Sequence, residues 1–147
     1  MVTLTGQPFA ASLPARRYAV SEVIQVGLDI DRAVLDARIA DRVSQMWRAG
    51  MMAEVRQLVA VGLRNGLTAS RALGYRQVLA FLAGEIGEVE ARELTVTATR
   101  RFARRQDYWF RKDPRIVWFP HDAPDLVDRV DGLLDSPVRA AAMEMPD

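Results

Sequence analysis

The 147-residue chain contains no cysteine, a single histidine (His121) and a single lysine (Lys112). Without cysteine it can form no disulfide scaffold, and one histidine cannot supply the ligands of a zinc finger. A P-loop needs a lysine after its glycine-rich turn, whereas Lys112 stands in the sequence Arg-Lys-Asp-Pro. The patterns GxxxxGKS, GxxxxGKT and GxGxxG are absent as well. The chain therefore contains neither a P-loop nor a dinucleotide-binding fingerprint.

Long apolar runs are also missing. No stretch of about eighteen apolar residues occurs, so we expect no transmembrane helix and no membrane partner. The segment from Met1 to Ser12 has no basic region followed by an apolar one, so we expect no signal peptide and a cytoplasmic location. Half of the residues are hydrophobic, which is sufficient for one domain with a core.

Charge is distributed unevenly along the chain. Residues 1–121 carry 18 Arg and Lys against 12 Asp and Glu, a net charge of +6, and residues 122–147 carry 2 against 7, a net charge of −5. A basic body with an acidic tail suggests a polyanionic partner for the body. A solvated surface with no partner explains the same charges equally well.

The apolar pattern predicts an α/β fold that is mainly helical in this chain, with two short strands. The strands are Val23–Ile30 and Arg115–Phe119, both nearly continuous in apolar residues. Such strands are typical of a parallel sheet covered on both faces. Because two strands alone make a marginal sheet, we expect them to belong to a larger one, with the first and fourth helices packed on them. The exposed sheet edge is then a site for self-association.

Helices account for most of the remaining chain. Asp31 is placed to cap the first helix, which Gly50 ends. Arg71–Leu82 is predicted as the third helix, and a long fourth helix ends at Asp113-Pro114. The sequence thus divides into an extended segment over 1–20, a helical body over 21–121 and an acidic tail over 122–147 whose last dozen residues we expect to be disordered. The other predicted helices cover Met51–Val61 and Asp125–Leu134.

The long helix concentrates cations on one side. At about 100° per residue, one arc of the helix holds Arg100, Arg101, Arg104, Arg105, Tyr108, Arg111 and Lys112. The opposite side holds Phe102, Trp109 and Phe110, which we expect to fill the core. Clustered arginines with an interleaved tyrosine suit phosphates and stacked bases. An arginine-rich face exposed to solvent, with no ligand, is the alternative interpretation.

Two smaller groups of cations precede the long helix. In the first, Gly74 permits a close approach of the backbone, and Arg71, Tyr75 and Arg76 supply donors and a ring. In the second, Arg38 and Arg42 lie four residues apart on the first helix. From spacing alone, pairing of this second group with Asp36 or Asp41 is the better explanation.

Several segments, in order, resemble the C-terminal signature of bacterial tRNA dimethylallyltransferases. The central ones are Ser70–Gln77 (SRALGYRQ), Leu82–Glu85 (LAGE) and Thr99–Gln106 (TRRFARRQ). The similarity covers most of residues 2–119 and leaves out the acidic tail. The further matching positions are Leu4–Gly6, Gly50, Ala53–Arg56, Trp109–Arg111 and Trp118.

This resemblance implies a P-loop-like, nucleotide-binding transferase that uses Mg²⁺. Such an enzyme transfers a dimethylallyl group from dimethylallyl diphosphate to the exocyclic amine of the adenosine beside the anticodon of tRNA. It implies that Arg42 helps to neutralise the diphosphate, and that no catalytic residue or metal ligand lies in this chain. It also implies tRNA contacts by Arg71, Ala72, Leu73, Gly74, Tyr75, Arg76, Arg100, Arg101, Arg104, Arg105, Gln106, Tyr108 and Arg111.

The chain departs from the family pattern within the basic run. Arg104 stands where the family often has lysine, which keeps the charge, and Asp107 adds an acidic residue. Three interpretations follow from the sequence: a fragment of the transferase that is inactive alone, a free-standing RNA-binding module, or an arginine-rich helical interaction domain without nucleic acid.

Overall fold

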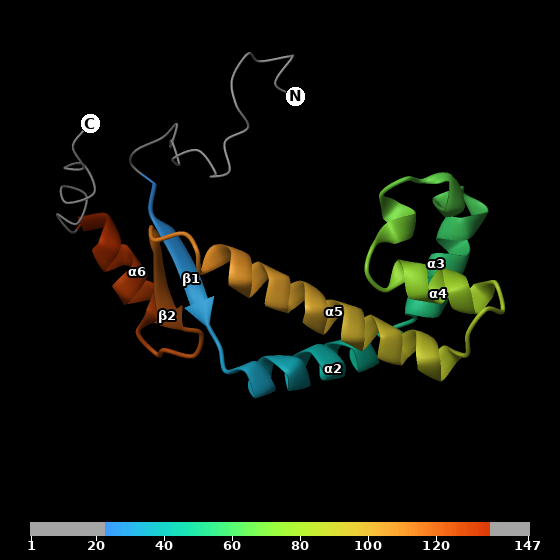
Figure 1. Cartoon of the computed structure of the whole chain (residues 1–147), viewed down its shortest axis with the longest axis horizontal. Coiled ribbons are helices and arrows are strands. Elements are labelled where there is room, and N and C mark those ends of the chain that lie inside the picture. The colour runs from blue at the N-terminus through green and yellow to red at the C-terminus, as the bar shows by residue number, and fades with distance from the viewer. Residues whose placement is uncertain (1–22, 136–147) are drawn as a thin grey trace, which may run out of the picture.

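The structure is a computed structural model that describes residues 23–135. The predicted extended segment over 1–20 and the predicted disorder of the last dozen residues lie outside this range. Two long helices bridge two ends of the molecule (Figure 1). One end holds a pair of strands and a short helix, and the other holds two short helices. The elements are β1 (Gln25–Asp29), α2 (Arg32–Arg48), α3 (Met51–Ala60), η1 (Leu63–Asn65), η2 (Ala69–Arg71), α4 (Tyr75–Leu82), α5 (Glu88–Phe110), β2 (Ile116–Pro120) and α6 (Leu126–Asp135).

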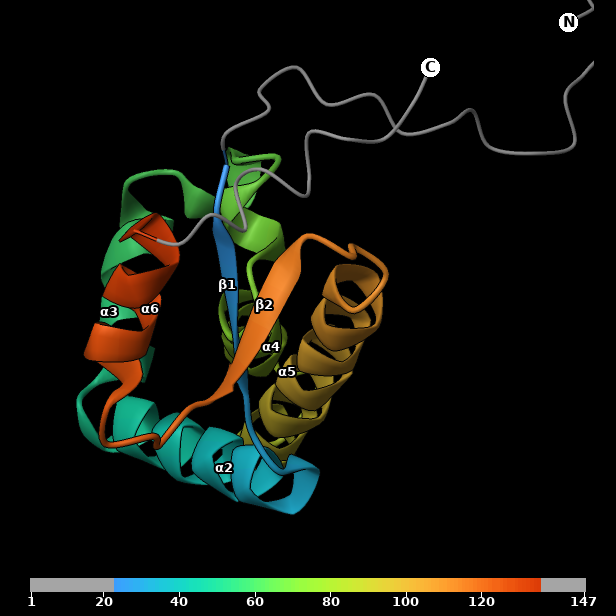
Figure 2. The same cartoon turned by 90° about the vertical axis from the view of Figure 1, so that its left-hand side faces the viewer.

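The two strands pair in parallel, from Gln25 opposite Ile116 to Asp29 opposite Pro120. This confirms the predicted fold class, a mainly helical chain with two short parallel strands. The predicted cover is wrong in one respect, because α5 and α6 flank the strand pair (Figure 2). The central guanidinium carbon of Arg129, on α6, lies 5.0 Å from the centroid of the Phe119 ring. Side chains alternate between the faces of a strand, so Phe119 faces α6 while its neighbour Trp118 faces α5.

Helix α2 begins and ends at the predicted positions for identifiable reasons. The Asp31 carboxylate accepts hydrogen bonds from the backbone amides of Ala33 at 2.8 Å and Val34 at 3.0 Å, which satisfies donors that have no partner within the helix. Gly50, with φ of 100°, separates α2 from α3. A left-handed conformation here favours glycine, which has no Cβ to clash.

The third helix begins later than predicted, at Tyr75 instead of Arg71. The reason is Gly74, whose φ of 90° and ψ of −51° interrupt the helical path. Its amide donates to the Gln77 side chain at 3.0 Å, and a Cβ at this position would overlap the Met51 methyl group. The close backbone approach that Gly74 permits is therefore used inside the fold.

The densest part of the core lies between α3 and α4. Met51, Val55, Leu63 and Val78 form one buried cluster. Along the bridge, α2 and α5 pack through a thinner apolar seam that includes Ile39 and Val43 of α2 and Ala91 of α5. No helix within residues 23–135 is long and apolar enough to cross a membrane.

The predicted core position of the α5 aromatic residues is wrong. The Trp109 side chain is 72% exposed, and Phe102 and Phe110 are also exposed. Helix α5 is covered on the side of Phe102 and Trp109 only along its first half, where Ala91 and Thr95 of that same side are buried. Along the second half of α5 no element in the described part of the chain buries these aromatic residues.

Candidate nucleic-acid interface

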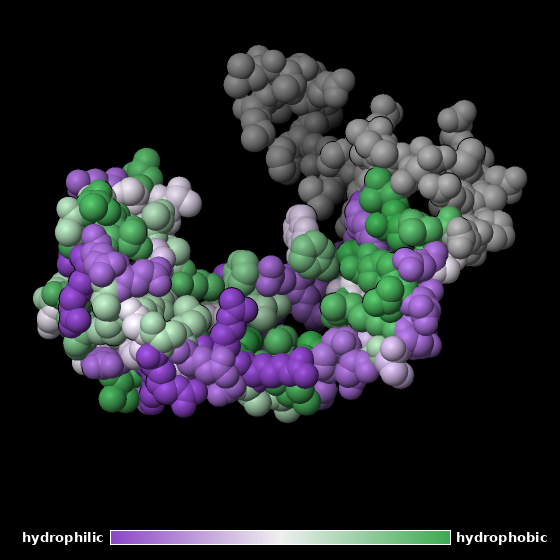
Figure 3. Space-filling view, turned by 180° about the vertical axis from the view of Figure 1, so that it is seen from behind, coloured by the Kyte–Doolittle hydropathy of each residue, from purple (hydrophilic) through white to green (hydrophobic). Residues whose placement is uncertain are grey.

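The bridge of α2 and α5 forms the floor of a hollow between the two ends of the molecule (Figure 3). Hydrophilic side chains run along this bridge. The cations of α5 lie on it, but the structure gives them different surroundings. Their ion pairs and exposure separate those that a ligand can reach from those already engaged within the fold.

A ligand can reach three arginines of α5, which are Arg101, Arg104 and Arg105. These arginines and Tyr108 are called the α5 basic face. All four residues are exposed. Arg101 and Arg105 make no ion pair with any residue of 23–135, and Arg104, 66% exposed, is 4.0 Å from Asp36. The Arg105 guanidinium lies 5.7 Å from the Phe102 ring centroid. An anion on this face would meet charges that are not neutralised in the fold.

Tyr108 extends this face towards the end of α5. The Lys112 ammonium lies 3.9 Å from the centroid of its ring. A hydrogen bond with Lys112, and then the attraction of its charge, lower the pKa of Tyr108 below the ordinary value. An exposed ring beside cations is a suitable surface for a nucleic-acid base.

Arg100 is engaged differently, because it joins α5 to α2. Its guanidinium donates to the backbone carbonyl of Asp36 at 3.0 Å and 3.3 Å. Arg32 of α2 returns a hydrogen bond to the Arg100 carbonyl at 3.1 Å and pairs with the Asp36 carboxylate at 2.7 Å. Asp36, which the sequence suggested only as a partner of Arg38 or Arg42, is the centre of this contact. Arg32 and Asp36 lie four residues apart, and this spacing in the sequence could have predicted their ion pair on one side of α2.

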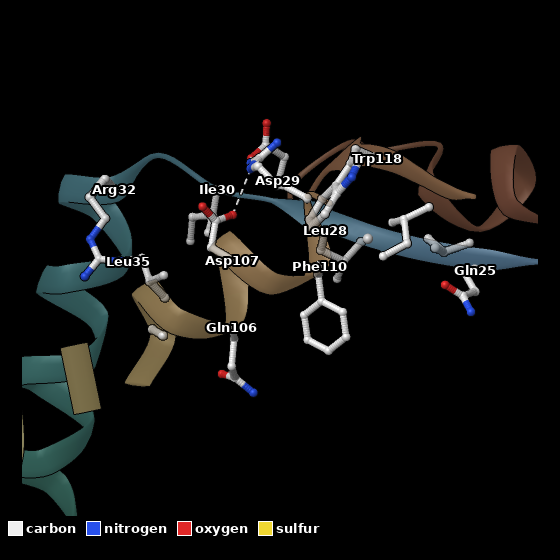
Figure 4. A pocket seen from close by; sticks show the side chains of 15 residues that line it. Gln25, Leu28, Asp29, Ile30, Arg32, Leu35, Gln106, Asp107, Phe110 and Trp118 are labelled. Atoms are coloured by element: carbon white, nitrogen blue, oxygen red, sulfur yellow. Dashed lines mark hydrogen bonds and ion pairs between the residues drawn. The ribbon is translucent and has the colours of Figure 1, made fainter. Parts of the chain in front are cut away.

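Arg111 and Gln106 line a cleft of about 760 Å³ between the strands, α2 and α5. Figure 4 shows Asp29, Asp107 and Trp118 near one another at this cleft. Arg111 donates hydrogen bonds to Asp29 and to Asp107. The bond to Asp29 is the larger cause, and the bond to Asp107 the second, that raises the pKa of Arg111 above its ordinary value. The apolar wall includes Leu28, Ile30, Leu35, Phe110 and Ile116.

The segment from Arg71 to Arg76 lies against the first half of α5. A Cβ on Gly74 would be 3.7 Å from the Thr95 side chain, and Arg101 follows about 9 Å further along the helix axis. Arg71, Ala72, Leu73 and Arg76 are exposed, whereas Gly74 is buried. The structure thus packs the first predicted tRNA-contacting segment against the helix that carries the second.

Tyr75 is partly engaged within the fold. Its hydroxyl donates to the Glu54 carboxylate of α3. This hydrogen bond is the main cause that raises the pKa of Tyr75, followed by burial and the Glu54 charge. The contact fixes the start of α4 on α3, and leaves the exposed arginines on either side of it.

Arg38 and Arg42 do not make the ion pairs that their spacing favoured. Asp36 pairs with Arg32, Arg100 and Arg104, and Asp41 accepts a hydrogen bond from Gln45 at 2.7 Å. Arg42 is exposed and has no ion pair with another residue of 23–135. It remains a free cation on α2 as far as the described chain is concerned.

Comparison with known proteins shows one consistent relationship. Residues 1–113 match the IPP transferase family. The tRNA dimethylallyltransferase of Nocardioides sp. is 58% identical over 129 residues, which are 88% of this chain and 42% of that protein. The enzyme of the same name from Thermobifida fusca is 58% identical over 136 residues, covering 91% of this chain and 42% of the relative.

Solved structures agree with the sequence matches. The full-length tRNA isopentenylpyrophosphate transferase of Bacillus halodurans superposes with a TM-score of 0.71 at 30% identity, over 76% of this chain and 38% of that one. The tRNA delta(2)-isopentenylpyrophosphate transferase of Staphylococcus epidermidis gives 0.72 at 25% identity, over 78% and 38%. The chain therefore spans about two fifths of the length of the proteins it matches.

Proposed function

Because this chain belongs to the IPP transferase family, we propose that it forms the tRNA-binding portion of a tRNA dimethylallyltransferase. In the complete reaction, the exocyclic nitrogen of an adenosine forms a bond to the dimethylallyl carbon. The bond from that carbon to the diphosphate oxygen breaks, diphosphate leaves, and the nitrogen gives up one of its two protons. This chain would hold the tRNA during that step, and the part of its relatives beyond the match would carry out the chemistry.

The observation that supports this role is the α5 basic face. Arg101 and Arg105 are exposed cations without an ion pair among residues 23–135, beside Arg104 and the exposed Tyr108 ring. Phosphate contacts supply most of the affinity for a nucleic acid, because each one releases counterions. Arg71 of η2 and Arg76 of α4 are two further exposed cations, in the segment that packs against the first half of α5.

Arg42 is proposed as a cation for the diphosphate leaving group, since it is exposed and has no ion pair with another residue of 23–135. Mg²⁺ would neutralise the developing charge of that group. The described residues contain no cluster of three or more acidic, histidine or cysteine side chains that could hold a metal ion. No step is therefore assigned to Mg²⁺ on this chain.

The chain alone is proposed to lack transferase activity, because no P-loop lysine is present to bind the outer phosphates. Transfer of labelled dimethylallyl groups to tRNA by the purified chain would contradict this part of the proposal. Location in the cytoplasm, where tRNA is modified, is proposed with it.

Salt-dependent binding to tRNA tests the proposed interface. If about four arginines reach phosphates, log K should fall against log salt with a slope of roughly −3 to −4. The double substitution Arg101→Gln with Arg105→Gln should make that slope shallower by about 1–2 units, because each lost contact removes about one released counterion.

A matched control removes two exposed arginines elsewhere, with Arg56→Gln and Arg64→Gln. These residues lie on α3 and η1, away from the α5 basic face. We expect the control to keep the wild-type slope. If the Arg101 and Arg105 variant is folded and its slope is unchanged, α5 is not the tRNA surface.

A further inference from the structure

Arg111 sits immediately after the last residue of α5, as its C-terminal cap. Its guanidinium contacts three side chains from three elements. It pairs with the Asp29 carboxylate at the end of β1 and, through Nε at 2.9 Å, with Asp107 one turn back on α5. Its central carbon lies 4.5 Å from the Trp118 ring centroid on β2. An arginine is suited to this arrangement, because its planar fork can pair with carboxylates while its face stacks on a ring.

The partners of Arg111 are themselves held in place. Trp118 is paired with Gly27 across the strands, and the indole lies so close to Gly27 that a Cβ there would stand 2.5 Å from it. The Asp29 carbonyl accepts a hydrogen bond from the His121 amide at 2.9 Å. Arg111 therefore contacts residues whose positions are fixed by the strand pair. Because Arg111 caps α5, these contacts hold the end of α5 against the strands.

Local charge separates Arg111 from the arginines of the α5 basic face. One guanidinium beside two carboxylates leaves a local net charge of −1, which disfavours an approaching phosphate. Arg101 and Arg105 have no carboxylate partner among residues 23–135. The same side-chain type on one helix thus occurs in two electrostatic surroundings with opposite consequences for an anion.

We infer that Arg111 is a positioning residue that fixes the end of α5 on the strand pair, and that it makes no contact with tRNA phosphate. By holding the last turn, it sets the direction in which Tyr108 and the α5 basic face point relative to the sheet. The second consequence rests on the proposed tRNA-binding function, whereas the contact itself does not.

Two substitutions at the same position distinguish a positioning role from a phosphate contact. Lysine keeps the charge needed for a phosphate but cannot pair with two carboxylates and stack on a ring together. We expect Arg111→Lys and Arg111→Gln to behave alike. Both should lower the melting temperature by a few degrees and move the indole N–H signal of Trp118 in a ¹H–¹⁵N spectrum, assigned with Trp118→Phe. Both should weaken tRNA binding several-fold with an unchanged salt slope.

Arg105 provides the comparison on the same helix. Arg105→Lys should keep the wild-type salt slope, and Arg105→Gln should make it shallower by about one unit. Neither should move the Trp118 signal, because Arg105 contacts Phe102 instead.

Asp29→Asn keeps the arginine and weakens its carboxylate pair, so it tests the contact if the Arg111 variants do not fold. It should move the Trp118 signal as Arg111→Lys does, and leave the salt slope unchanged. The inference is overturned if Arg111→Lys retains the wild-type melting temperature and Trp118 signal while Arg111→Gln makes the slope shallower. If the chain binds no tRNA at all, the proposed function fails, and the melting temperatures and Trp118 signals still decide the role of Arg111 in the fold.

Discussion

The indole ring of Trp118 lies directly on the backbone of Gly27, its partner across the parallel strands. A Cβ on Gly27 would stand 2.5–2.7 Å from three ring carbons, which is closer than real Cβ contacts. Glycine is needed at this position for the space it leaves, since its φ is not in the left-handed region. The Trp118 ring therefore occupies the space that the side chain of any other residue at position 27 would fill.

Gly27→Ala should destabilise the fold, because either the ring or the strand must shift. We expect a loss of about 1–3 kcal/mol in the free energy of unfolding, measured by urea denaturation. Gly132→Ala in α6 is the matched control, since nothing lies within 4 Å of its added Cβ. There we expect a gain of about 0.5–1 kcal/mol from helix propensity. Equal stability of Gly27→Ala and wild type would rule out the close packing of Trp118.

Trp109→Ala should leave stability nearly unchanged, although it removes the largest side chain of the region. Because the ring is 72% exposed, we expect a change within about 0.5 kcal/mol, as for other surface substitutions. Val55→Ala, at a fully buried position, should cost about 1–3 kcal/mol through lost burial and a cavity. Urea denaturation of the two variants compares them directly. A large loss for Trp109→Ala would show that the ring is covered in solution, by another copy or by residues outside the described range.

Two tyrosines should give the stability of the chain opposite dependences on alkaline pH. The pKa of Tyr75 is raised above 10.0, so the stability from its hydrogen bond to Glu54 is present below pH 10 and is lost as pH rises through the raised pKa. The pKa of Tyr108 is lowered by Lys112, so its contribution appears at high pH and is lost as pH falls through the lowered pKa.

The urea midpoint between about pH 9 and about pH 11, spanning the ordinary tyrosine pKa, tests this pair. Relative to wild type, Tyr75→Phe should lose less stability over that range, and Tyr108→Phe should lose more. Midpoints of both variants that run parallel to wild type would contradict the two contacts.

The sequence predicted the elements of this fold because their signals are local. Asp31 caps α2, Gly50 ends it, and Asp113-Pro114 follows the last turn of α5. The parallel pairing was also predictable, since continuous apolar strands are typical of parallel sheets. The start of α4 was not, because the lack of room for a side chain at Gly74 comes from Met51, which is distant in the sequence.

The candidate site was predictable as a group of residues but not as an arrangement. A helical wheel places Arg100, Arg101 and Arg104 within one arc, yet it contains no information about α2. The contact between Arg100 and Asp36 joins residues 64 positions apart. The exposure of Trp109 was missed for a related reason. Periodicity identifies an apolar side of a helix, but it cannot say whether the residues that cover that side are in the chain.

The register of β1 on β2 joins positions about 90 residues apart, with both bridge helices between them in sequence. Turns of helix form within about a microsecond, because their contacts are local. The strands can meet only after the chain has returned along α5, and closing a loop of this length carries an entropy cost that grows with its logarithm. Contacts of such long sequence separation slow folding. We therefore expect the strand pair, and the Arg111 contact that depends on it, to form after the turns of the individual helices.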